Sequence, residues 1–589
     1  MGSVRDALRA GLTHLAPMGK VVRSCTITLL MRGHAGVARV LSVCFAVVSS
    51  LGAQTDRARD IDAVFTNWNK PDSPGAAVAV IEHGKTVYEK GYGSANLEYS
   101  IPIGPQTIFH VASVSKQFTA MSIVLLERDG KLSIDDEVHK YLPELPRYDS
   151  PITLRNLLQH TSGIRDQWQT LATAGWSLED VITQDQILRM LFRQKELNFA
   201  PGSRYLYSNS GFTLLAEIVR RVSGKLLPDF CEERIFGPLG MTRTHFHLDL
   251  HRIVPGRAYS YSAVKGGGFE NAPLNYANVG ATSLFTTAGD LVKWLDNFRD
   301  PKVGGPAAIA RMQEQCVLTD GKKADYALGI VPGMYRGLKT ISHNGADAGF
   351  RSAVIWFPDQ ELGVAVLSNL GNFNPTQAAN KVAEVFLADK MTALPAQPQP
   401  VTRTFITLEP AALQAFAGTY PLPAIGQTLD TVVDQGKLWA VMPDKSRLEM
   451  KAVGPAHFYL GELQADIEFS AKPNGGMNAK ITQPGAVNSG DRVVSAAPVK
   501  PDLNAYAGVY WSEELEAEYT ILAHDGTLFA SNSHHGEFEL TATTKDKFRS
   551  GKFFFQDVTF VRNQQDRVIA LTVGGGRVTA IRFERRQTP

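Results

Sequence analysis

Ser113-Val114-Ser115-Lys116 stands at the head of an apolar segment and decides how the rest of the chain is interpreted. Residues at i and i+3 share a helix face, so this spacing places the Lys116 ammonium beside the Ser113 hydroxyl. An amine in that position eases deprotonation of the hydroxyl during acyl transfer. The segment 117–126 is apolar and helix-compatible until Asp129-Gly130 ends it. Ser113 is therefore expected at a helix N-terminus, where free N–H groups favour a developing oxyanion.

A second segment, Ser262-Ala263-Val264-Lys265, has the same four-residue pattern. It runs directly into Gly266-Gly267-Gly268, which cannot open a stable helix. We therefore expect a surface loop there and keep Ser113 as the candidate nucleophile.

Two further segments make the pattern specific. Tyr207-Ser208-Asn209 follows Pro201-Gly202 and precedes the amphipathic helix expected over 211–222. His343-Asn344-Gly345 precedes the apolar strand expected over 353–357. Both have competitors, Tyr276-Ala277-Asn278 for the first and His34, His524 and His534 for the second, but the order and the flanking sequence favour the first set.

Together the three segments resemble the serine β-lactamase and penicillin-binding-protein group, closest to its class C β-lactamase, D-aminopeptidase and esterase branch. The resemblance covers roughly residues 60–385 and includes 159–164, 282–291 and Phe357-Pro358-Asp359. It implies an α/β (α+β) catalytic domain with a central antiparallel sheet. The sheet is expected to begin with a hairpin over 76–81 and 86–92 and to close with strands over 352–357 and 362–368, with a helical insertion around 178–195.

The resemblance also implies a role for each motif residue. Ser113 is the acylated nucleophile, Lys116 its amine partner, and Tyr207 a general base that later returns the proton. The side chain of Asn209 holds the substrate amide. The N–H groups of Ser113 and Ala346, next to Gly345, form the oxyanion hole. The reaction is acyl transfer to water, and we expect no cofactor and no metal.

His343 is the main departure from β-lactamases proper, which usually carry Lys there. A fixed ammonium helps bind the carboxylate of a β-lactam, whereas imidazole, with a pKa near 6.5, is mostly neutral at pH 7. A Tyr207 phenolate also needs positive charge nearby, because the tyrosine pKa is near 10. We therefore expect a peptidase or esterase, whose affinity for carboxylate substrates improves as the pH falls through about 6.5. The Ser-Asp-Asn and Lys-Thr-Gly elements of class A enzymes are absent from the sequence.

Each motif residue also has a purely structural interpretation: Ser113 as a helix cap, Lys116 as a solvated charge, Tyr207 as a buried aromatic, Asn209 as a turn residue and His343 as a core histidine. The functional alternatives are a true β-lactamase and a catalytically weak protein that binds penicillin or cell-wall peptides. Trapping of Ser113 by a covalent probe separates an enzyme from a binder.

The composition agrees with a globular hydrolase of several domains. The chain has 589 residues and a formal net charge of +2, without a Lys/Arg block, a Gly-rich phosphate loop or zinc-type Cys/His spacing. We expect a small-molecule or peptide substrate and no nucleic acid partner.

Residues 1–53 have the features of a secretory signal. Arg32 and Arg39 precede the apolar run 40–48, which is too short to span a bilayer and is followed by small residues. We expect translation from Met31, cleavage at the end of this region and a periplasmic or secreted product; the alternative is an uncleaved membrane anchor. Cleavage removes two of the four cysteines and leaves Cys231 and Cys316, which could form one bridge.

The sequence beyond the catalytic region contains an internal repeat. The segments 413–420 and 503–510 match, and the same offset aligns 436–440 with 526–530. Short strands and Gly turns replace the helical pattern. Pro395, Pro398 and Pro400 mark a stiff linker.

We therefore predict two all-β lipocalin-like domains after the catalytic domain, resembling those of D-aminopeptidases. Their role is either to reach over the active site and limit substrate size or to act as a passive stability module. The aromatics Phe416, Tyr506 and 553–555 are expected in the barrel cores. The predicted boundaries are 1–53 signal region, 54–390 catalytic domain, 391–405 linker, 406–490 first β-domain and 491–589 second β-domain.

Overall fold

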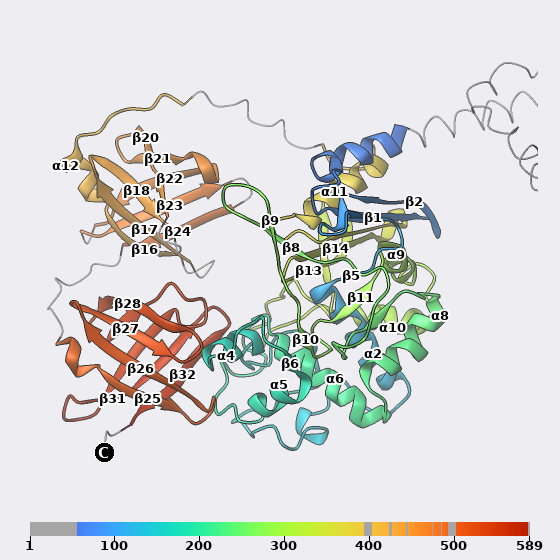
Figure 1. Cartoon of the computed structure of the whole chain (residues 1–589), viewed down its shortest axis with the longest axis horizontal. Coiled ribbons are helices and arrows are strands. Elements are labelled where there is room, and N and C mark those ends of the chain that lie inside the picture. The colour runs from blue at the N-terminus through green and yellow to red at the C-terminus, as the bar shows by residue number, and fades with distance from the viewer. Residues whose placement is uncertain are drawn as a thin grey trace, which may run out of the picture. The chain divides into compact units, whose positions relative to one another are not determined.

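The computed structural model describes residues 56–393, 403–422, 427–442, 446–473, 475–483, 486–492 and 502–586 (Figure 1). The predicted signal region and the linker prolines lie outside the described residues. Ile61–Pro589 form one compact unit. We call 56–393 the catalytic region, 403–492 the first β-domain and 502–586 the barrel. Within these ranges, no helix has both the length and the apolar character needed to cross a bilayer.

A six-stranded antiparallel sheet in the order β12-β13-β14-β15-β1-β2 is the centre of the catalytic region. Its strands are β1 (Ala76–Glu82), β2 (Lys85–Tyr92), β12 (Val331–Tyr335), β13 (Leu338–Asp347), β14 (Phe350–Phe357) and β15 (Leu362–Ser368). Side chains alternate between its faces, so Ala77 and Ala79 belong to one hydrophobic cluster and Val78 and Val80 to another. Because both faces are covered, β1 and β15 are apolar almost throughout.

Helices cover both faces of this sheet. The face of Ala77 packs in one cluster with α2 (Lys116–Arg128) and α9 (Ala288–Asp296), and the other face packs against α11 (Pro375–Leu387). Residues 56–65 are also helical, and further α-helices of the region are α3 (Leu154–Leu158), α4 (Gln167–Thr173), α5 (Gln184–Leu191), α6 (Asn209–Ser223), α7 (Leu227–Cys231), α8 (Gly237–Leu239) and α10 (Gly305–Met312). The short strands are β3 (Ser94–Asn96), β4 (Ile101–Pro102), β5 (Phe109–His110), β6 (Ile182–Thr183), β7 (His245–Phe246), β8 (Tyr261–Ala263), β9 (Phe269–Asn271), β10 (Tyr276–Ala277) and β11 (Leu284–Thr286).

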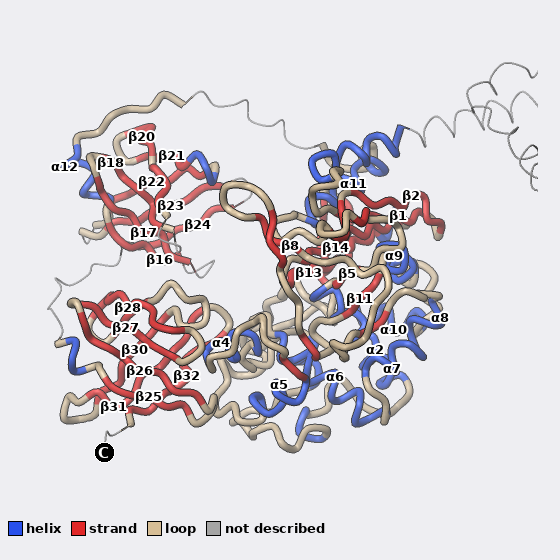
Figure 2. The backbone as a smooth tube through the Cα atoms, in the orientation of Figure 1, coloured by secondary structure: helices blue, strands red, loops and turns tan. Residues whose placement is uncertain are grey.

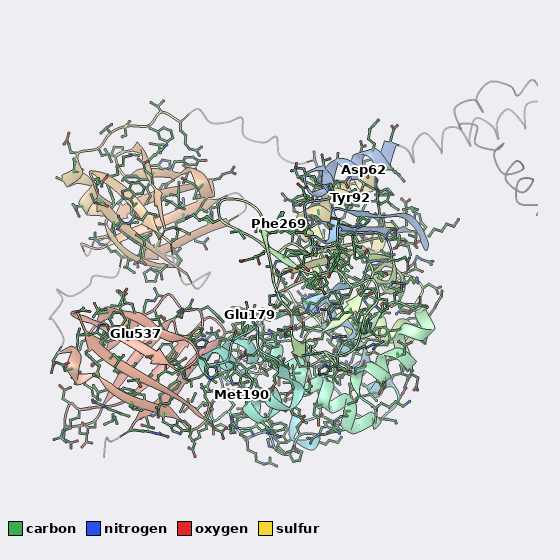
Figure 3. The ribbon with its side chains drawn as sticks, viewed as in Figure 1. Asp62, Tyr92, Glu179, Met190, Phe269 and Glu537 are labelled. Atoms are coloured by element: carbon green, nitrogen blue, oxygen red, sulfur yellow. The ribbon has the colours of Figure 1, made fainter. Side chains whose placement is uncertain are left out.

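Asp62 connects the helical residues 56–65 to strand β2 through hydrogen bonds. Its Oδ1 atom accepts hydrogen bonds from Tyr88 Oη (2.9 Å), Lys90 Nζ (2.7 Å) and Tyr92 Oη (2.8 Å); Asp62 and Tyr92 are labelled in Figure 3. Phe65 is fully buried and stacks on Tyr92 at 4.5 Å between ring centroids. The core of the catalytic region therefore begins within a few residues of the predicted cleavage point.

The predicted elements of the sheet are confirmed. The hairpin over 76–81 and 86–92 is β1 and β2, with His83 at the turn in a left-handed conformation (φ 49°), and the closing strands are β14 and β15. The insertion predicted around 178–195 contains β6 and α5. Ser262 does not open a helix, as predicted, but it lies in β8, which forms a hairpin with β9 rather than an irregular loop.

The duplicated sequence forms two similar series of strands, which are red in Figure 2. The first β-domain has a short helix α12 (Pro410–Leu413) and two sheets, made of β16 (Gly418–Leu422), β17 (Gln427–Asp434), β18 (Lys437–Val441) and β19 (Arg447–Glu449), and of β20 (Lys451–Gly454), β21 (His457–Leu460), β22 (Ala465–Ala471), β23 (Met477–Gln483) and β24 (Ala486–Asp491). The barrel is closed, in the order β25 (Gly508–Ser512), β26 (Ala517–His524), β27 (Thr527–Asn532), β28 (Gly536–Thr544), β29 (Lys547–Arg549), β30 (Asp557–Arg562), β31 (Val568–Gly575) and β32 (Val578–Arg585).

Equivalent residues of the two repeats make equivalent contacts. Tyr420 Oη donates to Phe416 O (3.0 Å), and Tyr510 Oη donates to Tyr506 O (2.7 Å). Both tyrosines are fully buried. The fold class predicted for the whole chain is confirmed, while the predicted domain boundaries stay a prediction.

Two of the smaller expectations need comment. Phe416, Tyr506, Phe554 and Phe555 are buried in the β cores as predicted, but Phe553 is 49% exposed, so the expectation was wrong for that residue. All three phenylalanines lie in one turn between strands, and this turn directs Phe554 and Phe555 into the barrel core and leaves Phe553 at the surface. Cys231 and Cys316 are buried and free, and so do not form the bridge that the sequence allowed.

Candidate active site

Ser113 lies on a 3₁₀ turn, Ala112–Ser115, that leads directly into α2 at Lys116. The preceding Ala112 has φ of 47°, a left-handed conformation that is costly for a residue with a Cβ atom. Such a conformation persists only where the surroundings fix it. Here Val111 N–H donates to Leu284 O (3.0 Å), and Ser115 Oγ accepts from Leu284 N (3.1 Å), so strand β11 holds both ends of the turn.

Lys116 is completely buried and uses all three of its N–H donors. Its Nζ atom donates to Ser113 Oγ (3.0 Å), Asn209 Oδ1 (2.8 Å) and Ala281 O (2.8 Å). Since Ser113 Oγ accepts from Lys116, its own hydrogen is available to Tyr207, which lines the same cavity and whose pKa the Ser113 hydroxyl lowers.

The amine and the phenol have altered acidity. Burial lowers the pKa of the Lys116 ammonium to about 7; Asp166 and Asp347 oppose this shift and Arg577 adds to it. Burial raises the pKa of Tyr207 above its ordinary value, although the bond to Ser113 and the charge of Arg577 act against this. The neutral phenol is therefore favoured in the free site. Since the two groups are close, with Nζ 4.9 Å from the Tyr207 ring centroid, the proton lost near pH 7 belongs to the pair.

Asn209 is held by a residue that the motif search did not identify, Asp166. Asp166 is buried, and its Oδ2 atom accepts from the backbone N–H (2.8 Å) and the side-chain amide (2.7 Å) of Asn209. The amide nitrogen of Asn209 is thereby turned to Asp166 and its oxygen to Lys116. Asp166 also caps α4 by accepting from Trp168 N (3.1 Å).

The end of β13 approaches the candidate nucleophile closely at Gly345. A Cβ atom on Gly345 would lie 2.3 Å from Val111 O, 2.5 Å from Ser352 Oγ and 3.0 Å from Ser113 N, so no side chain fits there. Asn344, Gly345 and Ala346 line the same cavity as Ser113. The predicted oxyanion hole needs Ser113 and Ala346 at one cavity, which this approach provides.

His343 differs from the expectation. It is buried and is not among the described residues that line the cavity. Its Nδ1 atom donates to Asn344 O (2.6 Å), and its Nε2 atom accepts from Tyr326 Oη (3.0 Å), the pattern of a neutral imidazole. Burial, and next the charge of Lys116, lowers the pKa of His343 to about 4. The expected titration near pH 6.5 was therefore wrong, because Tyr326 and the surrounding core remove the ring from solvent.

A cavity of about 400 Å³ opens over Ser113. Its lining residues come from several segments of the catalytic region and, in one case, from the barrel: Ala112, Ser113, Trp168, Leu178, Tyr207, Asn209, Thr282, Asn344, Gly345, Ala346, Asp347 and Arg577. Two of these side chains, Asp347 and Arg577, are charged. Asp347 Oδ2 accepts from Thr282 Oγ1 (2.9 Å) and lies 3.2 Å from His110 Nε2.

Arg577 belongs to the turn between β31 and β32 of the barrel. The guanidinium carbon lies 4.8 Å from the centroid of the Tyr207 ring, and Nη1 lies 3.8 Å from Asp166 Oδ2. Elsewhere in this contact, Arg165 of the catalytic region forms an ion pair with Glu514 in which both side chains are buried. One β-domain therefore does reach the active site, as the first of the two roles requires, while a limit on substrate size stays a prediction.

The motif search identified Ser113, Lys116, Tyr207 and Asn209, which the structure brings together. It missed Asp166, Asp347 and Arg577, because none belongs to a pattern of spaced residues. For Asp166 a weak signal existed: an acidic residue directly before a helix is a typical N-cap.

Comparison with known proteins places these features in context. A sequence profile for the family described as Beta-lactamase matches residues 61–388. A D-aminopeptidase of Cereibacter sphaeroides is 29% identical over 474 residues, which cover 78% of this chain and 83% of the relative. Penicillin-binding protein 4* of Bacillus subtilis is 26% identical, with coverage of 70% and 94%. The solved octameric penicillin-binding protein homologue from Pyrococcus abyssi has the same fold, with a TM-score of 0.52 at 24% identity over 74% of this chain and 99% of that one.

Proposed function

This chain belongs to the Beta-lactamase family of serine hydrolases, and on that premise we propose that it cleaves amide bonds of D-amino acid substrates through an acyl-enzyme on Ser113. The resemblance noted in the sequence is confirmed, and the chain is a serine hydrolase of the peptidase or esterase type. The preference for D-amino acids is taken from relatives named D-aminopeptidase, in Cereibacter sphaeroides and Gluconobacter oxydans.

The observation that carries the assignment of residues is the grouping at one cavity of Ser113, which accepts a hydrogen bond from Lys116 (3.0 Å), and of Tyr207, whose ring centroid lies 4.9 Å from Lys116 Nζ. A serine hydroxyl is a weak nucleophile unless a neighbouring group accepts its proton. Here the acceptor is the Lys116–Tyr207 pair after it has lost one proton. Asp166 and Asn209 keep the Lys116 nitrogen in place.

Acylation then follows from this geometry. Ser113 Oγ attacks the substrate carbonyl carbon while its proton passes to the pair, and the carbonyl oxygen becomes an oxyanion held by the N–H groups of Ser113 and Ala346. The pair gives the proton to the leaving nitrogen, and the C–N bond breaks. The products of this step are the free amine and an ester on Ser113.

Deacylation repeats these steps with water in place of the serine hydroxyl. Water loses a proton to the pair as it attacks the ester carbonyl carbon, and the same N–H groups hold the oxyanion. The bond between the acyl carbon and Ser113 Oγ then breaks, the pair returns the proton to Ser113 Oγ, and the carboxylic acid leaves. The enzyme is thus restored without any cofactor taking part in a step.

A hydrolysis screen and covalent labelling test this proposal. We expect D-alanine p-nitroanilide to be cleaved faster than its L-enantiomer and faster than nitrocefin, and a fluorophosphonate to label Ser113. Ser113→Ala should abolish labelling and nearly all turnover, while Ser262→Ala should change neither. Faster turnover of nitrocefin would favour a true β-lactamase, and label on Ser262 would overturn the assignment of Ser113.

We also propose export to the periplasm or the medium, with loss of residues 1–53. The support is the charged and apolar pattern of that region. N-terminal sequencing of the protein from a cell fractionation tests it: we expect the mature chain to begin at Gln54. Recovery of the uncleaved chain in the membrane fraction would support an anchor instead.

A further inference from the structure

The barrel contributes one side chain to the cavity over Ser113, and that side chain is a cation. Arg577 is the one positively charged residue in the described lining, since Lys116 lies beneath the surface with its three donors used. His343, where β-lactamases carry a fixed ammonium, is neutral here. The charge that could hold an anionic group therefore comes from a different domain.

The main chain of Arg577 is held at both of its polar groups by the catalytic region. Its N–H donates to Gln169 Oε1 (2.8 Å), and its carbonyl oxygen accepts from Asn198 Nδ2 (2.9 Å) and Asp166 N (3.4 Å). The turn itself needs left-handed conformations at Gly575 (φ 123°) and Gly576 (φ 57°). The position of Arg577 is therefore fixed by the docking of the barrel on the catalytic region. A residue that determines specificity needs a supporting structure of this kind.

The guanidinium group, by contrast, has donors to spare. In the part of the chain that the structure describes, it donates no hydrogen bond within 3.5 Å, and its Nη1 atom lies 3.8 Å from the carboxylate oxygen Asp166 Oδ2. That oxygen already accepts two hydrogen bonds from Asn209. The side chain is 47% exposed and lies beside the face of the Tyr207 ring.

We propose that Arg577 binds a carboxylate of the substrate, so that the enzyme prefers D-amino acid amides or peptides carrying a free carboxylate near the scissile bond. A guanidinium presents paired N–H groups that match a carboxylate, and such charge-assisted bonds are among the stronger ones in proteins. Asp347 is the other charged lining residue, and its negative charge excludes a carboxylate from its own part of the cavity. The two charges thus orient the substrate. This inference rests on the proposed function.

Matched substrate pairs test the inference and locate the carboxylate. D-glutamyl and D-glutaminyl p-nitroanilide place the charge in the acyl group, while D-alanyl-D-alanine and its C-terminal amide place it in the leaving group. For the anionic member of one pair, we expect Arg577→Gln to raise KM about tenfold. The same substitution should change KM for the neutral member less than twofold. Arg577→Lys should recover part of the lost affinity for the anionic member. Arg577→Glu should reverse the preference. All rates are compared at pH 8.5, above the titration of the Lys116–Tyr207 pair.

Arg582→Gln is the matched control. Arg582 is an exposed arginine of the same barrel that pairs with Glu584, and its removal should change neither member of either pair. Equal changes for the anionic and neutral members would show that Arg577 only supports the fold, and would overturn the proposal. If instead no substrate is cleaved and the fluorophosphonate does not label Ser113, the proposed hydrolase function is wrong, and not only the carboxylate-binding role of Arg577.

Discussion

Acylation of Ser113 should depend on pH through the Lys116–Tyr207 pair, because the pair must lose one proton before it can accept another. Lys116 is completely buried, and its pKa is lowered from 10.5 to about 7. Below that pH the ammonium is retained and the rate should fall. Above it the rate should reach a plateau.

The size of the effect follows from this pKa. A group with a pKa of about 7 is deprotonated in about 1% of molecules at pH 5, so the rate constant there should be about a hundredth of the plateau. An ordinary lysine, with a pKa near 10.4, would instead give a rate still rising tenfold per unit between pH 7 and 9. The plateau itself is therefore informative.

Two substitutions should move this titration in opposite directions. The charge of Arg577 lowers the pKa of both members of the pair, so Arg577→Gln should shift the rise in rate to higher pH. Asp166 raises the pKa of Lys116, so Asp166→Asn should shift the rise to lower pH while keeping an acceptor for Asn209. Asp347 acts in the same direction as Asp166, and His343 is already neutral throughout this range.

The assay is the second-order rate constant for labelling of Ser113 by an uncharged fluorophosphonate, measured from pH 5 to pH 10. The reagent has no charge of its own, so the profile reports the free enzyme. A profile without a plateau below pH 9, or shifts of both variants in one direction, would refute the reasoning.

Three further outcomes are expected. Lys116→Ala and Tyr207→Phe should each lower kcat by several orders of magnitude, and the double variant should lose much less than their product, because groups that act as a unit are not additive. Glu514→Ala should cost about 3–5 kcal/mol in the free energy of urea unfolding, since it leaves the Arg165 guanidinium buried and unpaired, whereas Glu514→Leu with Arg165→Met should recover most of it. Gly345→Ala should prevent labelling of Ser113 with an unchanged circular dichroism spectrum in the far ultraviolet, because the added carbon would displace Val111 O and Ser113 N.

The elements nearest to Ser113 could be predicted because residues close together in the sequence determine them. The i, i+3 spacing of Ser113 and Lys116 survives in the structure as a 3.0 Å hydrogen bond. The strands over 76–81 and 362–368 could be predicted because they are nearly continuous apolar runs, which are typical of strands buried on both faces. The duplication was equally visible, because it requires no knowledge of contacts.

The residues that sequence reasoning missed act across long distances in the chain. Arg577 reaches Tyr207 through the docking of a whole domain, and nothing near Arg577 in the sequence reports that contact. The pKa of His343 was misjudged for the same reason, since it depends on burial and on the charge of Lys116, which is distant in the sequence. In both cases the residue type is visible in the sequence, but the residues that surround the side chain in the fold are not.

The position of Arg577 in the chain has a consequence for synthesis. A ribosome makes the other residues that line the cavity long before it reaches residue 577, and N-terminal domains fold first as the chain emerges. Until the barrel is made and docks, Ser113 lies in a cavity whose lining lacks Arg577. A protein shortened by proteolysis or early termination before the turn between β31 and β32 would lack Arg577, and we expect it to accept a wider range of substrates than the protein that carries this turn.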